Sequence, residues 1–171
     1  KDVNFNIEKG ETVGVIGRNG SGKTTLLKVL AGITKPEMGA MKIQGFASSL
    51  LELGTGFQEE LTGRENIFLN GSILGLRKKE IHKKFDDIVD FAEIGRFIDS
   101  PMRVYSTGMW MRLGFALAIN ANFEALLIDE VLAVGDISFQ KKCFEKFNEL
   151  KQKGITILFV SHNLEAVKNV C

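Results

Sequence analysis

The stretch ETVGVIGRNGSGKTTLLKVLAGI, residues 11–33, decides the fold of this chain. Its first part is a β-rich apolar run that ends at Gly17, and the residues after the glycines change to helical spacing. Between them, GRNGSGKT matches the phosphate-binding pattern G-x-x-x-x-G-K-[ST]. A chance match in a chain of this length arises in fewer than about one case in 100. The stretch therefore predicts a strand, a phosphate loop and a helix that stops near Gly32.

The predicted loop offers two kinds of positive charge to a phosphate. Its glycines let backbone N–H groups turn inward, and the helix that follows presents its positive end. Lys23 supplies a full charge to the β- and γ-phosphates, and the hydroxyl of Thr24 suits Mg²⁺. The predicted nucleotide-binding residues of this segment are Gly17, Arg18, Asn19, Gly20, Ser21, Gly22, Lys23, Thr24 and Thr25.

Two further apolar strands, expected at residues 125–129 and 156–161, alternate with helical segments. This pattern is typical of a parallel sheet covered on both sides, in which ligands bind at the carboxyl ends of the strands. Asp129 ends one strand and can hold Mg²⁺, while the adjacent Glu130 can polarise an attacking water. A lone histidine is more often structural, but the position of His162 after a strand favours contact with the γ-phosphate or with Glu130.

Composition restricts the remaining classes. The 171 residues, 44% hydrophobic and 25% charged, suit one folded domain. Lys and Arg number 22 against 21 acids, so charge gives no reason to expect a nucleic-acid partner. No apolar run approaches the roughly 20 residues of a membrane span, and the chain opens without a signal peptide. Cys143 and Cys171 are too few for a disulfide framework, so we expect structural thiols in a reducing cytosol.

The rest of the chain gives weaker patterns. Short strands are expected at residues 41–45 and 46–53, and a polar, glycine-rich stretch follows at residues 54–75. Apolar residues at helical spacing predict amphipathic helices at residues 77–94 and 141–154.

Five motifs in one order resemble the nucleotide-binding domain of the ATP-binding cassette (ABC) family. They are GRNGSGKT, YSTGM, LLIDE, VGD and SH, and they extend over residues 17–162. The resemblance implies an α/β P-loop NTPase fold, with a mainly parallel sheet covered by helices and an inserted helical subdomain. It places the catalytic core at residues 1–51 and 122–171 and the helical subdomain at about 52–121. It also implies ATP and Mg²⁺ as cofactors.

The segment YSTGM, residues 105–109, is similar to the signature of this family, usually L-S-G-G-Q at the head of a helix. Ser106 or Thr107 is expected to cap that helix. The resemblance implies that Ser106 and Gly108 bind the γ-phosphate held by a second copy, in a head-to-tail dimer that sandwiches two ATP molecules. It assigns Asp136, in AVGD, to the loop that crosses between the two sites.

The resemblance also assigns catalysis and metal binding. It names Lys23, Glu130 and His162 as catalytic, and Thr24 and Asp129 as metal ligands. A glutamine that touches Mg²⁺ and couples to the membrane subunit is usual after the strand that ends near residue 51. Glu52 leaves the expected strand here and is assigned to this position, with Gln58 as the alternative. The extra negative charge of a glutamate would change the charge balance of the metal site.

Departures from the usual signature point to one group within the family. Tyr105, Thr107 and Met109 replace Leu, Gly and Gln, a variant similar to cassettes that serve exporters of O-antigen, capsule or teichoic acid. The segments LLELGTGFQEELTGRENIFLNGSILGL and DEVLAVGDISFQKKC resemble the same group. This implies an ATPase subunit, peripheral at the cytoplasmic face of the inner membrane, that contacts permease subunits through residues 54–75. Two alternatives remain: a soluble ABC ATPase of DNA repair or translation, and a non-hydrolysing regulator.

The ends of the chain also differ from the family pattern. The aromatic that stacks on adenine in ABC domains would precede Lys1, and Phe5 is expected to pack in the core. Cys171 follows soon after His162, without the usual closing helices. The chain is therefore expected to be a fragment, truncated at both ends, in which adenine binding is impaired.

Overall fold

The computed structural model describes residues 3–51, 53–129 and 135–170. The chain divides into two compact units. Unit 1 comprises residues 1–51, 123–133 and 140–171, and unit 2 comprises residues 52–122 and 134–139.

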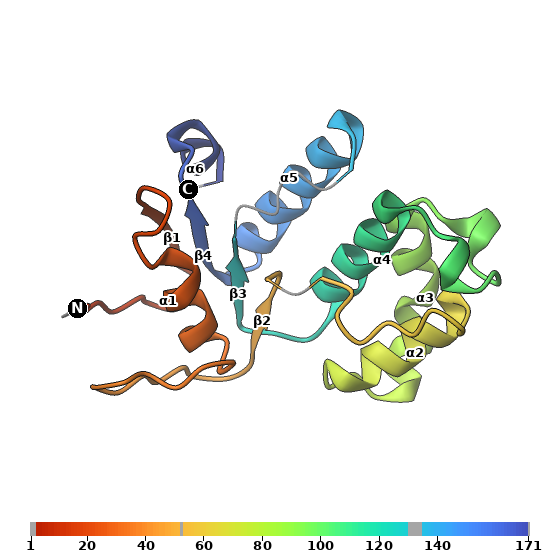
Figure 1. Ribbon diagram of the computed structural model, residues 1–171, viewed down its shortest axis with the longest axis horizontal. Coiled ribbons are helices and arrows are strands. Elements are labelled where there is room, and N and C mark those ends of the chain that lie inside the picture. The colour runs from red at the N-terminus through yellow and green to blue at the C-terminus, as the bar shows by residue number, and fades with distance from the viewer. Residues whose placement is uncertain (1–2, 52, 130–134, 171) are drawn as a thin grey trace. The chain divides into compact units, whose positions relative to one another are not determined.

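Unit 1 contains, among its described residues, a four-stranded sheet in the order β1-β4-β3-β2 (Figure 1). The strands are β1 (Thr12–Ile16), β2 (Ala47–Ser49), β3 (Ala125–Ile128) and β4 (Thr156–Ser161). All neighbouring pairs are parallel, so every strand ends at the same edge of the sheet. The side chains of β3 and β4 are almost wholly buried, which confirms the prediction of a parallel sheet that is covered on both faces.

Helix α1 (Lys23–Leu30) follows β1, as predicted, and stops before Gly32, whose φ is +74°. Its Leu27 packs in an apolar cluster with side chains of β3 and β4. Helix α6 (Leu164–Val170), which was not predicted, contacts β1 and β4. Helix α5 (Ile137–Gln152) has its first residues in unit 2 and the remainder in unit 1, where Cys143 is buried.

Unit 2 is helical. Its helices are α2 (Gly63–Ile73), α3 (Lys78–Ala92) and α4 (Thr107–Asn120), with two short 3₁₀ turns, η1 (Gly95–Phe97) and η2 (Met102–Val104). The predicted apolar face of α3 is confirmed, since Ile81, Ile88 and Ala92 are buried and Phe85 is partly buried. The other core residues of unit 2 include Ile67, on α2, and Leu113 and Leu117, on α4. No helix in the described parts of either unit is long and apolar enough to cross a membrane.

Two expectations about local structure were wrong. Residues 41–45 form no strand, and the strand expected at 46–53 is limited to Ala47–Ser49. The polar stretch at residues 54–75 contains helix α2. The signal for this helix is a capping box, in which the hydroxyl of Thr62 accepts from the N–H of Glu65 and the Glu65 carboxylate accepts from the N–H of Thr62.

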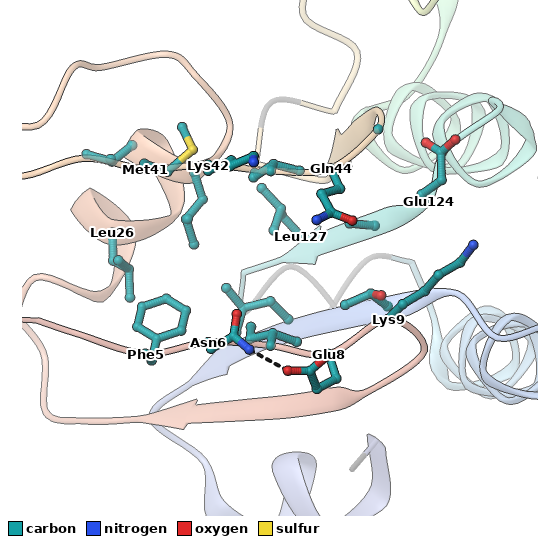
Figure 2. A pocket seen from close by; sticks show the side chains of 18 of the residues that line it. Phe5, Asn6, Glu8, Lys9, Leu26, Met41, Lys42, Gln44, Glu124 and Leu127 are labelled. Carbon is teal, nitrogen blue, oxygen red and sulfur yellow. Dashed lines mark hydrogen bonds between the residues drawn. The ribbon is translucent and has the colours of Figure 1, made fainter.

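The expectation that Phe5 packs in the core was also wrong. Its side chain is 50% exposed because residues 3–8 lie outside the strands of the sheet. Phe5 lines a pocket of about 1160 Å³ in unit 1, and Figure 2 shows it with Leu26 at one end of that pocket. The lining includes Glu124 and Thr156, near the amino ends of β3 and β4. This pocket is therefore distinct from the ligand-binding edge that the sequence predicts at the carboxyl ends.

Candidate nucleotide-binding site

The phosphate loop, Gly17 to Gly22, leaves β1 and turns directly into α1. Gly20 and Gly22 have φ angles of +78° and +93°, which a residue with a Cβ adopts only with strain. Gly22 is the N-cap of α1, so the unpaired N–H groups of the first helical turn border the loop. The helix dipole adds partial positive charge at the same place. The loop is thus built to receive an anion.

Lys23 is the first residue of α1 and is buried, with 9% of its surface exposed. Its ammonium donates hydrogen bonds to the carbonyl oxygens of Gly17, at 2.8 Å, and Arg18, at 3.0 Å. These two bonds hold the charge against the phosphate loop. A lysine ammonium has three donors, so one further donor can serve a phosphate oxygen.

Thr24 and Asp129 meet at the same edge of the sheet. The hydroxyl Oγ1 of Thr24, on α1, donates to Oδ2 of Asp129, directly after β3, at 3.1 Å. A hydroxyl and a carboxylate are oxygen ligands of the kind that Mg²⁺ prefers. The described part of the chain holds no cluster of three or more His, Cys, Asp or Glu side chains suited to a metal. The pair fits Mg²⁺, which commonly binds one or two carboxylates together with substrate phosphates.

His162 lies directly after β4 and is exposed. In the sheet, Ser161 pairs with Ile16 at the end of the neighbouring strand β1, so Gly17 and His162 leave adjacent strands at one edge. The backbone turns there because the Ser161 hydroxyl accepts from the N–H of Asn163, at 3.0 Å. Glu130 and Glu52, predicted as the catalytic base and a metal ligand, lie outside the described residues.

The signature segment lies in unit 2 at the start of α4. Of the two predicted caps, Ser106 is the N-cap, and its hydroxyl accepts from the N–H of Met109 at 3.2 Å. The phenol of Tyr105 donates to the carbonyl of Phe97 at 2.8 Å. Burial raises the pKa of Tyr105 to about 12, with a smaller contribution from the negative charge of Asp99, so this donor stays protonated at physiological pH. This hydrogen bond therefore ties Tyr105, the residue before the N-cap, to the last residue of η1.

Asp136 is held by two contacts within unit 2. Its Oδ1 accepts from the N–H of Phe139, at 2.9 Å, and its Oδ2 pairs with Nη2 of Arg112, at 2.8 Å. The Phe139 hydrogen bond and, to a lesser extent, the Arg112 charge hold the pKa of Asp136 below its usual value. Arg112 was not among the predicted site residues.

A second unpredicted residue orders the loop before α2. Asn66 is fully buried, and its Oδ1 accepts from the N–H of Gln58 at 2.8 Å. Its Nδ2 donates to the carbonyls of Gln58, Leu61 and Thr62, at 2.9 to 3.2 Å. One buried amide thus fixes the loop that carries Gln58, the alternative coupling residue. A polar residue four positions after the capping Thr62 was the available signal.

The glycine loop, the buried lysine and the threonine–aspartate pair at the carboxyl edge of a parallel sheet define a P-loop nucleoside triphosphatase. A family model described as "ABC transporter" matches residues 1–133. The chain belongs to the ABC transporter family, as one of its ATPase domains.

Two relatives that match almost the whole chain are named as export ATP-binding proteins. The chain is 53% identical over 171 residues to the "O-antigen export system ATP-binding protein RfbB" of Klebsiella pneumoniae, covering 100% of this chain and 70% of that protein. It is 46% identical over 170 residues to the "Teichoic acids export ATP-binding protein TagH" of Bacillus anthracis, covering 99% of this chain and 31% of that protein.

A solved structure gives the same fold. An ATP-binding cassette, determined as a dimer in a post-hydrolysis state bound to ADP and Pi, matches with a TM-score of 0.83 and 24% identity. The match covers 99% of this chain and 82% of that one. It confirms the predicted α/β P-loop fold with a parallel sheet and helices.

Proposed function

We propose that this chain is the ATP-binding and ATP-hydrolysing part of an exporter of cell-surface polysaccharide or teichoic acid. The observation that carries the proposal is 53% identity, over the full chain, to an O-antigen export ATP-binding protein. The 46% identity to a teichoic acid export protein supports the same class of cargo. In this proposal, unit 1 is the catalytic core, and unit 2 is the signature subdomain.

In the proposed reaction, the phosphate loop binds the triphosphate of ATP through the backbone N–H groups that border α1. Lys23 neutralises charge on the β- and γ-phosphates, which is where negative charge shifts during phosphoryl transfer. Thr24 and Asp129 would hold Mg²⁺, which supplies electrostatic stabilisation of the phosphates. Glu130 accepts the proton of the attacking water, and His162 orients that water or the γ-phosphate. Glu52, or alternatively Gln58, would add an oxygen ligand to that metal.

The proposed site is completed by a second copy of the chain. Ser106 caps α4 with its side chain, and Gly108 lies in the first turn, where the helix end carries partial positive charge. In a head-to-tail dimer these groups bind the γ-phosphate held by the partner's loop. Asp136 lies in the loop that passes between the two sites. The dimeric state recorded for the solved cassette of the same fold supports this assembly.

A substitution that introduces a negative charge at Gly108 tests whether this residue contacts the partner's γ-phosphate in the dimer. A Cβ there would have Ser106 Oγ at 3.8 Å as its nearest neighbour, so a side chain fits. Gly108→Asp should leave α4 intact, because an acid in the first turn is favoured by the helix dipole. The same charge repels the partner's γ-phosphate. We expect ATP-dependent dimerisation of the full-length protein, measured by light scattering, to weaken at least tenfold.

The uncharged variant Gly108→Ala separates added volume from added charge. It should weaken the dimer far less than Gly108→Asp, because a methyl group brings no negative charge toward the partner's phosphate. Equal losses in the two variants would contradict the phosphate contact at this position. A normal ATP-dependent dimer of Gly108→Asp would contradict it as well.

The proposed partner in the membrane is an integral permease that contacts residues 54–75, with the ATPase peripheral at the cytoplasmic face. Two exposed apolar side chains on α2 support this surface: Leu69 is 39% and Ile73 is 66% exposed. They are four residues apart and therefore lie on one face of the helix. Asn66 fixes the adjoining loop through four hydrogen bonds, which gives the surface a defined shape.

Deleting the gene in its own host tests the exported cargo. We expect the surface polysaccharide or teichoic acid to disappear from the cell wall or outer surface, as measured by immunoblotting of intact cells, while the polymer accumulates inside. Re-expression of the full-length protein should restore the surface polymer. An unchanged cell surface combined with sensitivity to DNA damage would favour the repair type of ABC ATPase and contradict export.

A further inference from the structure

Arg112, on α4, bridges two carboxylates that come from different parts of unit 2. Its Nη1 lies 2.6 Å from Oε2 of Glu93, and its Nη2 lies 2.8 Å from Oδ2 of Asp136. The side chain is 18% exposed, far less than its two partners. Its guanidinium also lies over the ring of Phe139, with Cζ 4.8 Å from the ring centroid. The group is thus held from three directions.

The bridge connects the signature helix α4 with the loop of Asp136, to which the proposed function gives different roles. Arg112 is four residues after Gly108, so the two residues lie on the same face of α4, one turn apart. Asp136 directly precedes α5 and accepts from the N–H of Phe139 in the manner of an N-cap. Glu93 is the C-cap of α3 and has a φ of +59°. One planar guanidinium therefore connects the signature helix, the end of α3 and the loop of Asp136.

We infer that Arg112 is a positioning residue that fixes Asp136 relative to the signature segment, so that the signature contact and the crossing loop move as one body. This inference rests on the proposed function, in which both groups meet the nucleotides of a dimer. The guanidinium suits the role because its donors have fixed directions and reach two carboxylates at once. Lysine presents a single charged nitrogen and cannot reproduce that geometry.

Apolar packing keeps this region folded independently of the bridge. Phe139 is 1% exposed and makes edge contacts with Phe91, from α3, and Phe115, from α4, at centroid distances of 5.6 and 6.0 Å. These contacts hold Phe139 in unit 2 without the help of Arg112. Removal of the guanidinium should therefore alter the orientation of Asp136 more than the stability of the unit.

The experiment uses the full-length protein with its permease and compares Arg112→Ala, Arg112→Lys, Asp136→Ala and the double variant Arg112→Ala with Asp136→Ala. Four quantities are measured: nucleotide binding by a fluorescent ATP analogue, kcat, the Hill coefficient for ATP hydrolysis and the melting temperature. Arg77→Ala is the matched control, because Arg77 makes an exposed ion pair with Glu80 at the start of α3.

For Arg112→Ala we expect kcat to fall about tenfold and the Hill coefficient to fall toward 1. Nucleotide binding should stay within about twofold of the parent, because the phosphate loop is untouched. The double variant should be no slower than the slower single variant, since both changes break one connection. Arg112→Lys should give a partial loss, and Arg77→Ala should match the parent.

Three outcomes would overturn the inference: cooperative hydrolysis by Arg112→Ala at the parent rate, full cooperativity in Arg112→Lys, or a double variant whose loss is the product of the single losses. If Arg112→Ala does not fold, Arg112→Lys and Asp136→Ala still decide between these results. Failure of the proposed function would appear differently, as a parent protein that neither hydrolyses ATP nor dimerises with it.

Discussion

Replacement of Lys23 with alanine is expected to lower the rate of ATP hydrolysis by about 100- to 1000-fold, the range found when one preorganised donor to a developing charge is removed. The ammonium is fixed by the carbonyls of Gly17 and Arg18 before any phosphate arrives. Because little reorganisation is needed, we expect its charge to act directly on the β- and γ-phosphates. The only other lysine of α1, Lys28, lies near the end of the helix, so it cannot replace the charge at the phosphate loop.

The fold should survive this change. Lys23 makes its described hydrogen bonds to loop carbonyls rather than to the apolar cluster under α1. Arg18 is exposed and Gly17 is partly exposed, so water can replace the lost donor. The melting temperature should therefore change by only a few degrees. ATPase rates of the full-length protein, measured by phosphate release, test the prediction.

Lys28→Ala is the matched control, because Lys28 lies on the same helix and is exposed. It should hydrolyse ATP at the parent rate. A Lys23→Ala variant with more than half of the parent activity would exclude the assigned role. An equal loss in the two variants would point to general damage of α1 instead.

Features that depend on residues close together in the sequence were predictable. The strand, loop and helix from Thr12 to Leu30 follow from local apolar spacing and from glycines required by the backbone. The Ser106 cap is equally local, since its acceptor and donor are three residues apart. The placement of Asp129 and His162 at one edge of the sheet was predictable too, because the carboxyl ends of parallel strands lie at the same edge.

Features that depend on distant partners were missed. Arg112 meets Glu93 and Asp136, which are 19 and 24 residues away, and periodicity carries no information about such pairs. Helix α2 was missed because its buried face includes Asn66 and Asn70, which read as polar positions in the sequence. Phe5 was expected in the core because the adenine-stacking aromatic would precede Lys1, and the structure places Phe5 on the wall of a pocket.

Replacement of Glu130 with glutamine is expected to reduce ATP turnover by about 100- to 10,000-fold, the contribution of a positioned general base. Its neighbour Asp129 accepts a hydrogen bond from the Thr24 hydroxyl at the ligand edge of the sheet. Glu130 itself lies outside the described residues. Glutamine has the same shape as glutamate but cannot take a proton from water, so binding of ATP should survive while hydrolysis stops.

This separation of binding from turnover gives a distinctive result. With Mg²⁺ and ATP, the full-length Glu130→Gln protein should accumulate as a dimer that retains ATP, because the closed state forms but is not relieved by hydrolysis. Size-exclusion chromatography and analysis of the bound nucleotide measure this directly. Lys23→Ala should give no such dimer, since it weakens the phosphate contact on which closure depends.

Glu124→Gln is the matched control for the loss of a carboxylate next to β3. Glu124 lies before the amino end of the strand, where its Oε2 accepts from the N–H of Phe46 at 2.7 Å, and a glutamine oxygen can accept the same bond. It should hydrolyse ATP normally. Unchanged hydrolysis by Glu130→Gln would move the catalytic base elsewhere, and the exposed His162, which leaves the strand β4 next to β3, would be the first residue to test.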